Sequence, residues 1–220
     1  LLLALLLRII FFTGFSGSDD YLLVKAADAL NKGALDFSAS NHIPLRLALL
    51  YPTAWVIGIF GIHDFSIAFF PLLCSLGIVL FTYLIGRKLY SEGVGLLAAA
   101  LLAIFPLEVL HGSILVAEPI AGFFFLVGFY FLLFDKRFFS FLGGIFLGIA
   151  YLAKEIYLLT LPLLLLYLWY RKKKIVSLHF LFFFGFLLVF LGELLYFYSS
   201  TGNFFYRQEA VQHFSALFSP

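Results

Sequence analysis

Two adjacent carboxylates, Asp19 and Asp20, follow the first apolar run of the chain and precede an amphipathic segment. At a boundary between lipid and water, a carboxylate can act as a general base that meets a lipid-borne donor and an aqueous acceptor. The structural alternative is that the two acids only stabilise the start of a helix, because each acid in the first turn contributes about 0.3–1 kcal/mol to helix stability. Asp19 and Asp20 are therefore the candidate catalytic residues, with Asp19 as the base.

A second ionisable pair, Lys154 and Glu155, interrupts a long apolar stretch (GIFLGIAYLA before it and IYLLTLPLLLL after it). Charged side chains inside a membrane segment are costly unless they meet partners or reach the surface. Two interpretations remain open. The two residues form a mutual ion pair at a helix turn, or Lys154 holds a lipid phosphate and Glu155 orients it.

Four other polar residues complete the predicted substrate-binding set. Glu118 precedes Pro119 at the start of an apolar stretch, which is typical of a first-turn acid as well as of a functional one. His111 lies shortly before it, and His42 and Arg46 lie in NHIPLRLALLYP.

Cofactor signals are weak. Asp19, His42, His111 and Glu118 could converge on a divalent metal ion, but no close-spaced ligand motif such as H-E-x-x-H occurs, so no metal ligand is assigned. The chain also has no glycine-rich phosphate loop, which favours a membrane-soluble donor over a nucleotide sugar.

The elements that must position these residues are predicted to be membrane helices. Hydrophobic residues make up 64% of the chain and charged residues 12%, with 31 Phe and a mean hydropathy of +1.09. This composition predicts an all-α, polytopic helical bundle that forms one membrane-embedded module over residues 1–220. The basic residues cluster between apolar runs instead of covering one face, so no nucleic-acid partner is expected. The single cysteine, Cys74, excludes a disulfide framework within the chain.

Three basic clusters order the predicted spans: Arg87-Lys88, Lys136-Arg137 and residues 171–174. They hold eight of the fourteen Lys and Arg residues, and the positive-inside rule assigns all three to the cytoplasm. The 33 residues between Arg137 and Arg171 are too long for one span, since they would extend roughly 50 Å as a helix, so we expect two helices broken at Lys154-Glu155. About seven spans result; they include residues 1–12, 64–86, 93–110, 117–134 and 175–198.

Residues 16–63 are predicted to form an outer-face loop. Ser18 is its expected N-cap, Asp19 and Asp20 its first turn, and Gly33 its helix terminator, which gives an amphipathic helix on the membrane surface. Residues 47–62 are apolar but short, and they contain Pro52, so a re-entrant or interfacial helix is expected there.

Several residues receive simpler expectations. Glu193 should face the bundle interior, and His63, His179 and Cys74 should be structural. The chain begins with Leu1 and contains no Met, which is typical of a fragment whose first helix is longer; a cleaved signal peptide is the alternative for residues 1–12.

Five stretches together, in their order and spacing, resemble the polytopic glycosyltransferases of the GT-C superfamily. They are SDDYLLVKAADALNKG, NHIPLRLALLYP, FGIHDFSIAFFPLL, IGRKLYSEGVGLLAAALLAIFPLEVLHGSILVAEP and GGIFLGIAYLAKE. The chain is most similar to the dolichyl-phosphate-mannose protein mannosyltransferase and aminoarabinose transferase-like group. The resemblance implies that Asp19 is the leading catalytic acid, Asp20 its companion, Glu118 the second-loop acid and Lys154 a lipid-phosphate contact.

The expected function is an integral-membrane, multi-pass glycosyltransferase of the plasma membrane with its site on the outer face. It would use a polyprenyl-phosphate sugar as donor and a protein, lipid or glycan as acceptor, with membrane lipids around it. A transporter or flippase for lipid-linked sugars is the alternative, although transporters commonly place such charges at membrane mid-depth. In a third alternative, a non-catalytic assembly subunit, Asp19 would only start a helix.

Overall fold

The regular secondary structure in the computed structural model, which describes residues 1–17, 19–38, 41–134, 136–171 and 176–216, is entirely helical. The predicted all-α class is therefore confirmed. In chain order the helices are α1 (Leu2–Ile10), α2 (Asp19–Asn31), η1 (Ile43–Leu45), α3 (Leu47–Phe60), α4 (Asp64–Leu89), α5 (Glu92–Ile104), α6 (Pro106–His111), α7 (Ala117–Leu132), α8 (Arg137–Ala153), η2 (Glu155–Leu159), α9 (Thr160–Arg171), α10 (Val176–Thr201) and α11 (Tyr206–Ala216).

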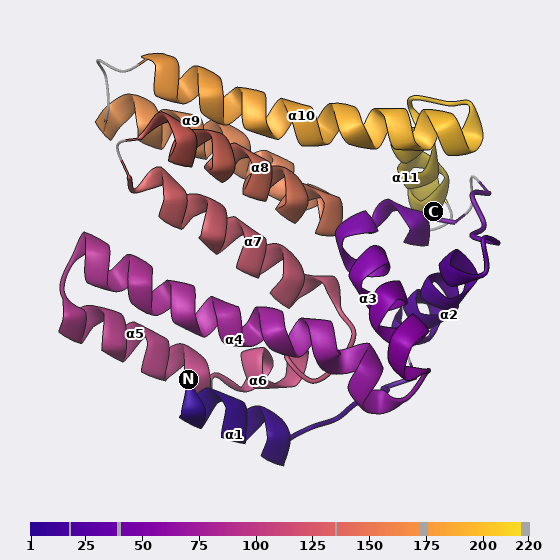
Figure 1. Ribbon diagram of the computed structural model, residues 1–220, viewed down its shortest axis with the longest axis horizontal. Helices are drawn as coiled ribbons and strands as arrows, with labels where there is room; N and C mark the ends of the chain where they lie inside the picture. Colours follow the sequence, from indigo (N-terminus) through magenta and orange to yellow (C-terminus); the bar gives the residue numbers. More distant parts are fainter. Residues whose placement is uncertain (18, 39–40, 135, 172–175, 217–220) are drawn as a thin grey trace.

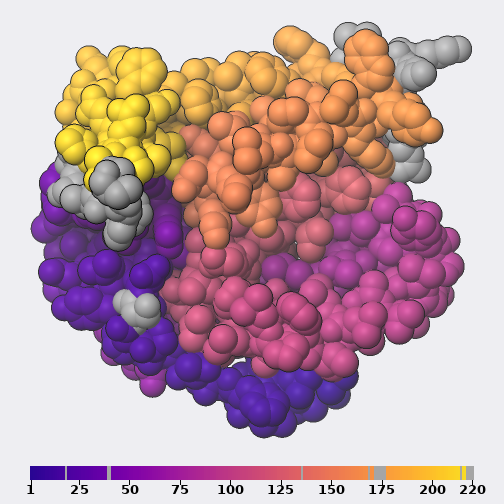
Figure 2. Space-filling model, turned by 180° about the vertical axis from the view of Figure 1, so that it is seen from behind, coloured from indigo at the N-terminus to yellow at the C-terminus, as the bar shows by residue number. Residues whose placement is uncertain are grey.

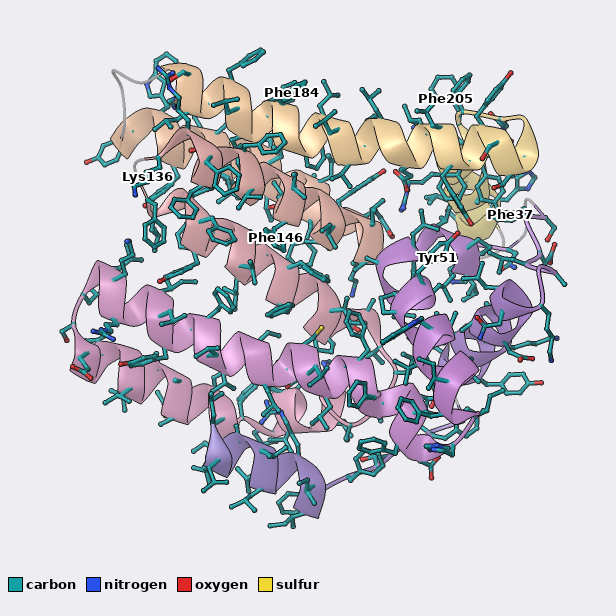
Figure 3. All side chains as sticks on the ribbon, in the orientation of Figure 1. Phe37, Tyr51, Lys136, Phe146, Phe184 and Phe205 are labelled. Carbon is teal, nitrogen blue, oxygen red and sulfur yellow. The ribbon has the colours of Figure 1, made fainter. Side chains whose placement is uncertain are left out.

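Six helices, α4, α5, α7, α8, α9 and α10, run roughly side by side, and α2, α3 and α11 gather at one end of this bundle (Figure 1). We call the latter the site end. Figure 3 shows Lys136 at the other end of the bundle, away from Phe37 and Tyr51. The ammonium of Lys88 lies 3.4 Å from the centroid of the Phe134 ring, so the carboxyl end of α4 adjoins the residues that follow α7.

This arrangement places two of the three basic clusters, Arg87-Lys88 and Lys136-Arg137, at one end, as the predicted topology requires. Residues 172–174 of the third cluster lie outside the described residues. Two helices of the described part have the length and apolar composition to cross a membrane, α4 and residues Ser177–Thr201 of α10. The apolar helices α3, α5, α7 and α8 have 10–17 residues each, so in the described part of the chain helix length and composition support two of the seven predicted spans.

Local signals explain most helix ends. Gly33 follows α2 with a φ of 65°, and the Ala34 amide donates to the Ala29 carbonyl at 2.8 Å, as in a Schellman C-terminus. The Ser18 cap predicted for α2 lies outside the described residues. His63 caps α4 by accepting a hydrogen bond from the Ser66 amide at 3.2 Å, which gives this histidine the structural role expected for it.

One predicted helix is broken. Residues 93–110 were expected to be continuous, but α5 ends at Ile104 and α6 begins at Pro106. Phe105 between them is extended, with φ −66° and ψ 119°, because a residue before proline is disfavoured in the helical region. The expected break at Lys154-Glu155 is present, since α8 ends at Ala153 and Lys154 is extended.

The tightest helix contact joins α8 to α10 through glycines. A Cβ added at Gly144 would overlap the carbonyl oxygen of Phe182, and one added at Gly185 would overlap that of Phe141. Small residues allow the two backbones to approach closely, which is how helices associate in lipid. This contact fixes α10 along α8 and thereby sets the position of the site end of both helices.

We expect Gly144→Ala to lower the melting temperature of the purified protein, because overpacking a tight contact costs about 1–3 kcal/mol. The matched control is Gly192→Ala on α10, where a Cβ would meet no atom within 4 Å. That change should be neutral or stabilising, since alanine is the better helix former. Equal melting temperatures for the two variants would contradict the close contact.

Candidate functional site

The adjacent acids Asp19 and Asp20 have different environments at the start of α2. Asp20 is buried, and its Oδ2 accepts hydrogen bonds from the Ser16 amide at 2.5 Å and the Ser16 hydroxyl at 3.0 Å. Asp19 is exposed. Asp20 therefore stabilises the turn that enters α2, and Asp19 is the acid of the pair that a substrate can reach.

Lys154 is paired across two helices. Its ammonium lies 2.6 Å from Glu118 Oε1 in the first turn of α7, and both side chains are partly exposed. The interpretation that Lys154 pairs with Glu155 is therefore wrong. Lys154 follows the last residue of α8, where the extended backbone ends the helix, and α7 packs along α8, so Glu118 is the acid that the packing brings to it.

A pocket of about 340 Å³ opens beside this ion pair. Glu118 and Lys154 supply its charged groups, and its other lining residues come from η2 and the start of α9: Ile156, Tyr157, Leu159, Thr160 and Leu163. A cation next to an apolar wall suits a ligand that joins an anionic group to a hydrocarbon chain. His111, at the end of α6, interacts electrostatically with Glu118.

His42 and Arg46 lie on either side of η1 and are half-buried. Burial lowers the pKa of His42 below its ordinary value, Arg46 lowers it further, and the charges of Asp19 and Glu155 act in the opposite direction. His42 therefore interacts electrostatically with Asp19 of α2 and with Glu155 of η2. It also lines a pocket of about 480 Å³ between α2 and the segment that follows it, together with Lys25 and Asp36.

Arg207 is a buried cation that the sequence interpretation did not include. Its Nε donates to Glu193 Oε1 at 2.7 Å, and its Nη2 donates to the Leu45 carbonyl at 2.7 Å. Its Nη1 lies 3.6 Å from Glu155 Oε2, and its guanidinium carbon lies 4.7 Å from the centroid of the Tyr151 ring. Glu193 is buried, as expected, and Arg207 is its partner.

The predicted site residues fall into two groups that are linked by electrostatic interactions. Asp19, His42 and Arg46 form one group, Glu118, Lys154 and His111 form the other, and Glu155 interacts with His42 of the first group and adjoins Lys154 of the second. In the described ranges, no set of three or more His, Cys, Asp or Glu residues is arranged to hold a metal ion.

A second buried arginine was also missed. Arg8 of α1 donates to the Ser75 hydroxyl at 2.8 Å and lies 3.9 Å from Glu108, and so ties α1 to α4 and α6. Both arginines had a detectable signal. A charge inside an apolar helix, Arg8 in one case and Glu193 in the other, requires a partner of opposite charge elsewhere in the chain.

Comparison with known protein families gives a match. A family model described as dolichyl-phosphate-mannose-protein mannosyltransferase matches residues 47–196, from the start of α3 into the last turns of α10. No curated protein and no solved structure matches the chain significantly. The matched part is more than half of the chain and contains Lys154 and Glu118, whereas Asp19, His42, Arg46 and Arg207 lie outside it.

Proposed function

The chain belongs to the dolichyl-phosphate-mannose-protein mannosyltransferase family, whose members are membrane-embedded glycosyltransferases, and we propose that it transfers a sugar from a polyprenyl phosphate to an acceptor on the non-cytoplasmic side. The observation that carries the proposal is Lys154. Lys154 lines a pocket whose other walls are mostly apolar, so one ligand could place its phosphate on the cation and its hydrocarbon along η2 and α9.

In the proposed reaction, the Asp19 carboxylate accepts the proton of an acceptor hydroxyl. The hydroxyl oxygen forms a bond to the anomeric carbon while the bond from that carbon to the phosphate oxygen breaks. The electron pair of the broken bond leaves with polyprenyl phosphate, and Lys154 stabilises the charge that develops there. This single displacement inverts the anomeric configuration. Glu118, His111 and Glu155 set the charge around Lys154, and Arg46 and His42 contact the donor or the acceptor.

The test of the function is turnover of a defined donor. The full chain in lipid nanodiscs should release polyprenyl phosphate from polyprenyl-phosphate mannose when membrane extract supplies acceptors, and should leave a nucleotide sugar intact. Mannose is the first sugar to test because the family description names it. Binding of the donor without cleavage of its glycosidic bond would overturn the proposal and favour a transporter or flippase.

We further propose a membrane topology with seven spans and the site end outside. The two basic clusters at the far end of the bundle and the acids at the site end support it (Figure 1). In this arrangement α1, α4, α5 with α6, α7, α8, η2 with α9, and α10 cross the membrane, and α2, α3 and α11 lie on the outer side, in the plasma membrane of the cell.

Cysteine labelling tests this topology. Cysteines introduced at Asp36 and at Lys88 should react with a membrane-impermeant maleimide from opposite sides of sealed vesicles. The native Cys74 is buried and should stay unlabelled in the unmodified chain, which serves as the control. Reaction of both introduced cysteines from the same side would exclude the seven-span arrangement.

A further inference from the structure

Two consecutive residues at the start of α11, Tyr206 and Arg207, hold the backbone of the segment between α2 and α3. The Tyr206 hydroxyl donates to the Asn41 carbonyl at 3.1 Å and lies 3.3 Å from the Ser38 carbonyl oxygen. Arg207 Nη2 donates to the Leu45 carbonyl at 2.7 Å. Asn41 directly precedes His42 and Leu45 directly precedes Arg46, so these bonds fix the backbone beside both predicted substrate-binding residues.

Both donors are themselves firmly anchored. The Tyr206 ring packs at 5.0 Å from the Phe197 ring of α10 and at 5.9 Å from the Phe37 ring. Arg207 is anchored by Glu193 of α10 and by the Tyr151 ring of α8, and both Tyr206 and Arg207 are at most 8% exposed. Figure 2 shows the surface of α11 beside that of the segment preceding α4, at one end of the molecule.

The third guanidinium nitrogen of Arg207, Nη1, lies near the turn that contains Lys154. Nη1 lies 3.6 Å from Glu155 Oε2, and Glu155 is the residue next to Lys154. A single guanidinium therefore connects the segment of His42 and Arg46 to the turn of Lys154. Arginine suits this position because its planar fork presents several donors in fixed directions, whereas lysine offers one compact charge.

We propose that Tyr206 and Arg207 are positioning residues, a clasp that holds residues 41–46 so that His42 and Arg46 face the Lys154 turn. The kinetic part of this inference rests on the proposed function, and the structural part stands without it. The clasp lies beyond residue 196, where the family match ends, so it belongs to the part of the chain that the family assignment leaves unexplained.

The test uses Tyr206→Phe in the full chain, because this change removes only the hydroxyl and keeps the ring in its aromatic cluster. The readout is the rate at which diethyl pyrocarbonate modifies His42, followed by peptide mass spectrometry. Loss of one hydrogen bond should raise that rate roughly 2- to 10-fold. The rates at His63 and His111 should not change, and Gln208→Ala, an exposed neighbour on α11, is the matched control.

A second variant addresses Arg207 without leaving a buried charge unpaired. The double change Arg207→Met with Glu193→Leu replaces a buried ion pair by apolar side chains, which proteins often tolerate. It removes the bonds to Leu45 and Glu155, so His42 should again become more reactive. Unchanged His42 reactivity in both folded variants would overturn the clasp.

Measuring sugar transfer shows whether the clasp only holds residues 41–46 or also positions them for the reaction. If the clasp positions the site, kcat/KM should fall by a similar 2- to 10-fold factor in Tyr206→Phe, measured at a temperature where the variant is fully folded. Increased His42 reactivity with unchanged kcat/KM would overturn the positioning role. Increased His42 reactivity in a chain whose unmodified form transfers no sugar would support the clasp and overturn the proposed function instead.

Discussion

Asp19→Asn is expected to abolish sugar transfer, with a loss of at least about 100-fold, because general base catalysis contributes typically 10²–10⁴-fold. Asparagine has the size of aspartate and is well tolerated at a helix start, but it takes up no proton at neutral pH. Asp19 is exposed, so the fold should be unaffected. The measurements are kcat for release of polyprenyl phosphate, donor affinity and melting temperature.

Asp20→Asn should behave in the opposite way. Its carboxylate is buried and accepts two hydrogen bonds from Ser16, so the main expected effect is a lower melting temperature. Asp28→Asn is the matched control, since Asp28 lies on the same helix and pairs with exposed Lys32 at 2.5 Å. Full activity of Asp19→Asn together with an inactive but stable Asp20→Asn would reverse the two assignments. Full activity of both variants would mean that Asp19 and Asp20 only stabilise the start of α2.

The apolar runs and the charged residues that interrupt them predict the helices well, because lipid-facing helices are constrained in length. Residues 137–171 exceed the thickness of one hydrocarbon core, and the break indeed falls at Lys154-Glu155. The break at Phe105 was missed, although Pro106 carries a clear signal for it. An apolar pattern that continues across a proline hides the end of the helix.

The partners of the charged residues were harder to predict than the helices. Neighbours in sequence suggest a Lys154–Glu155 pair, but ion pairing follows helix packing, and α7 places Glu118 next to Lys154 instead. The same limit hid Arg207, which lies in a polar segment and becomes notable only because Glu193 and the Leu45 carbonyl meet it. Contacts between residues 14 and 162 positions apart depend on tertiary packing, which a local pattern does not encode.

Lys154→Gln is expected to weaken binding of polyprenyl phosphate itself by about 10- to 100-fold. A hydrogen bond to a charged group contributes about 1.5–3 kcal/mol, and that contribution is lost with the ammonium. The melting temperature should change little, because Lys154 and Glu118 are partly exposed and such pairs contribute about 0–1 kcal/mol to stability. Lys154→Arg should keep part of the affinity, since the charge remains while its geometry changes.

The decisive control changes Glu118, the acid that pairs with Lys154. Glu118 holds the ammonium that the phosphate would contact, so Glu118→Gln should strengthen binding of polyprenyl phosphate by a few-fold. The double variant Lys154→Gln with Glu118→Gln then separates the two roles of the pair. If Lys154 binds phosphate, the double variant stays as weak as Lys154→Gln, because removing the competing acid does not restore the missing cation. If the pair only joins α7 to α8, the double variant melts like the unmodified chain and binds polyprenyl phosphate with its full affinity, and Lys154 has no phosphate role.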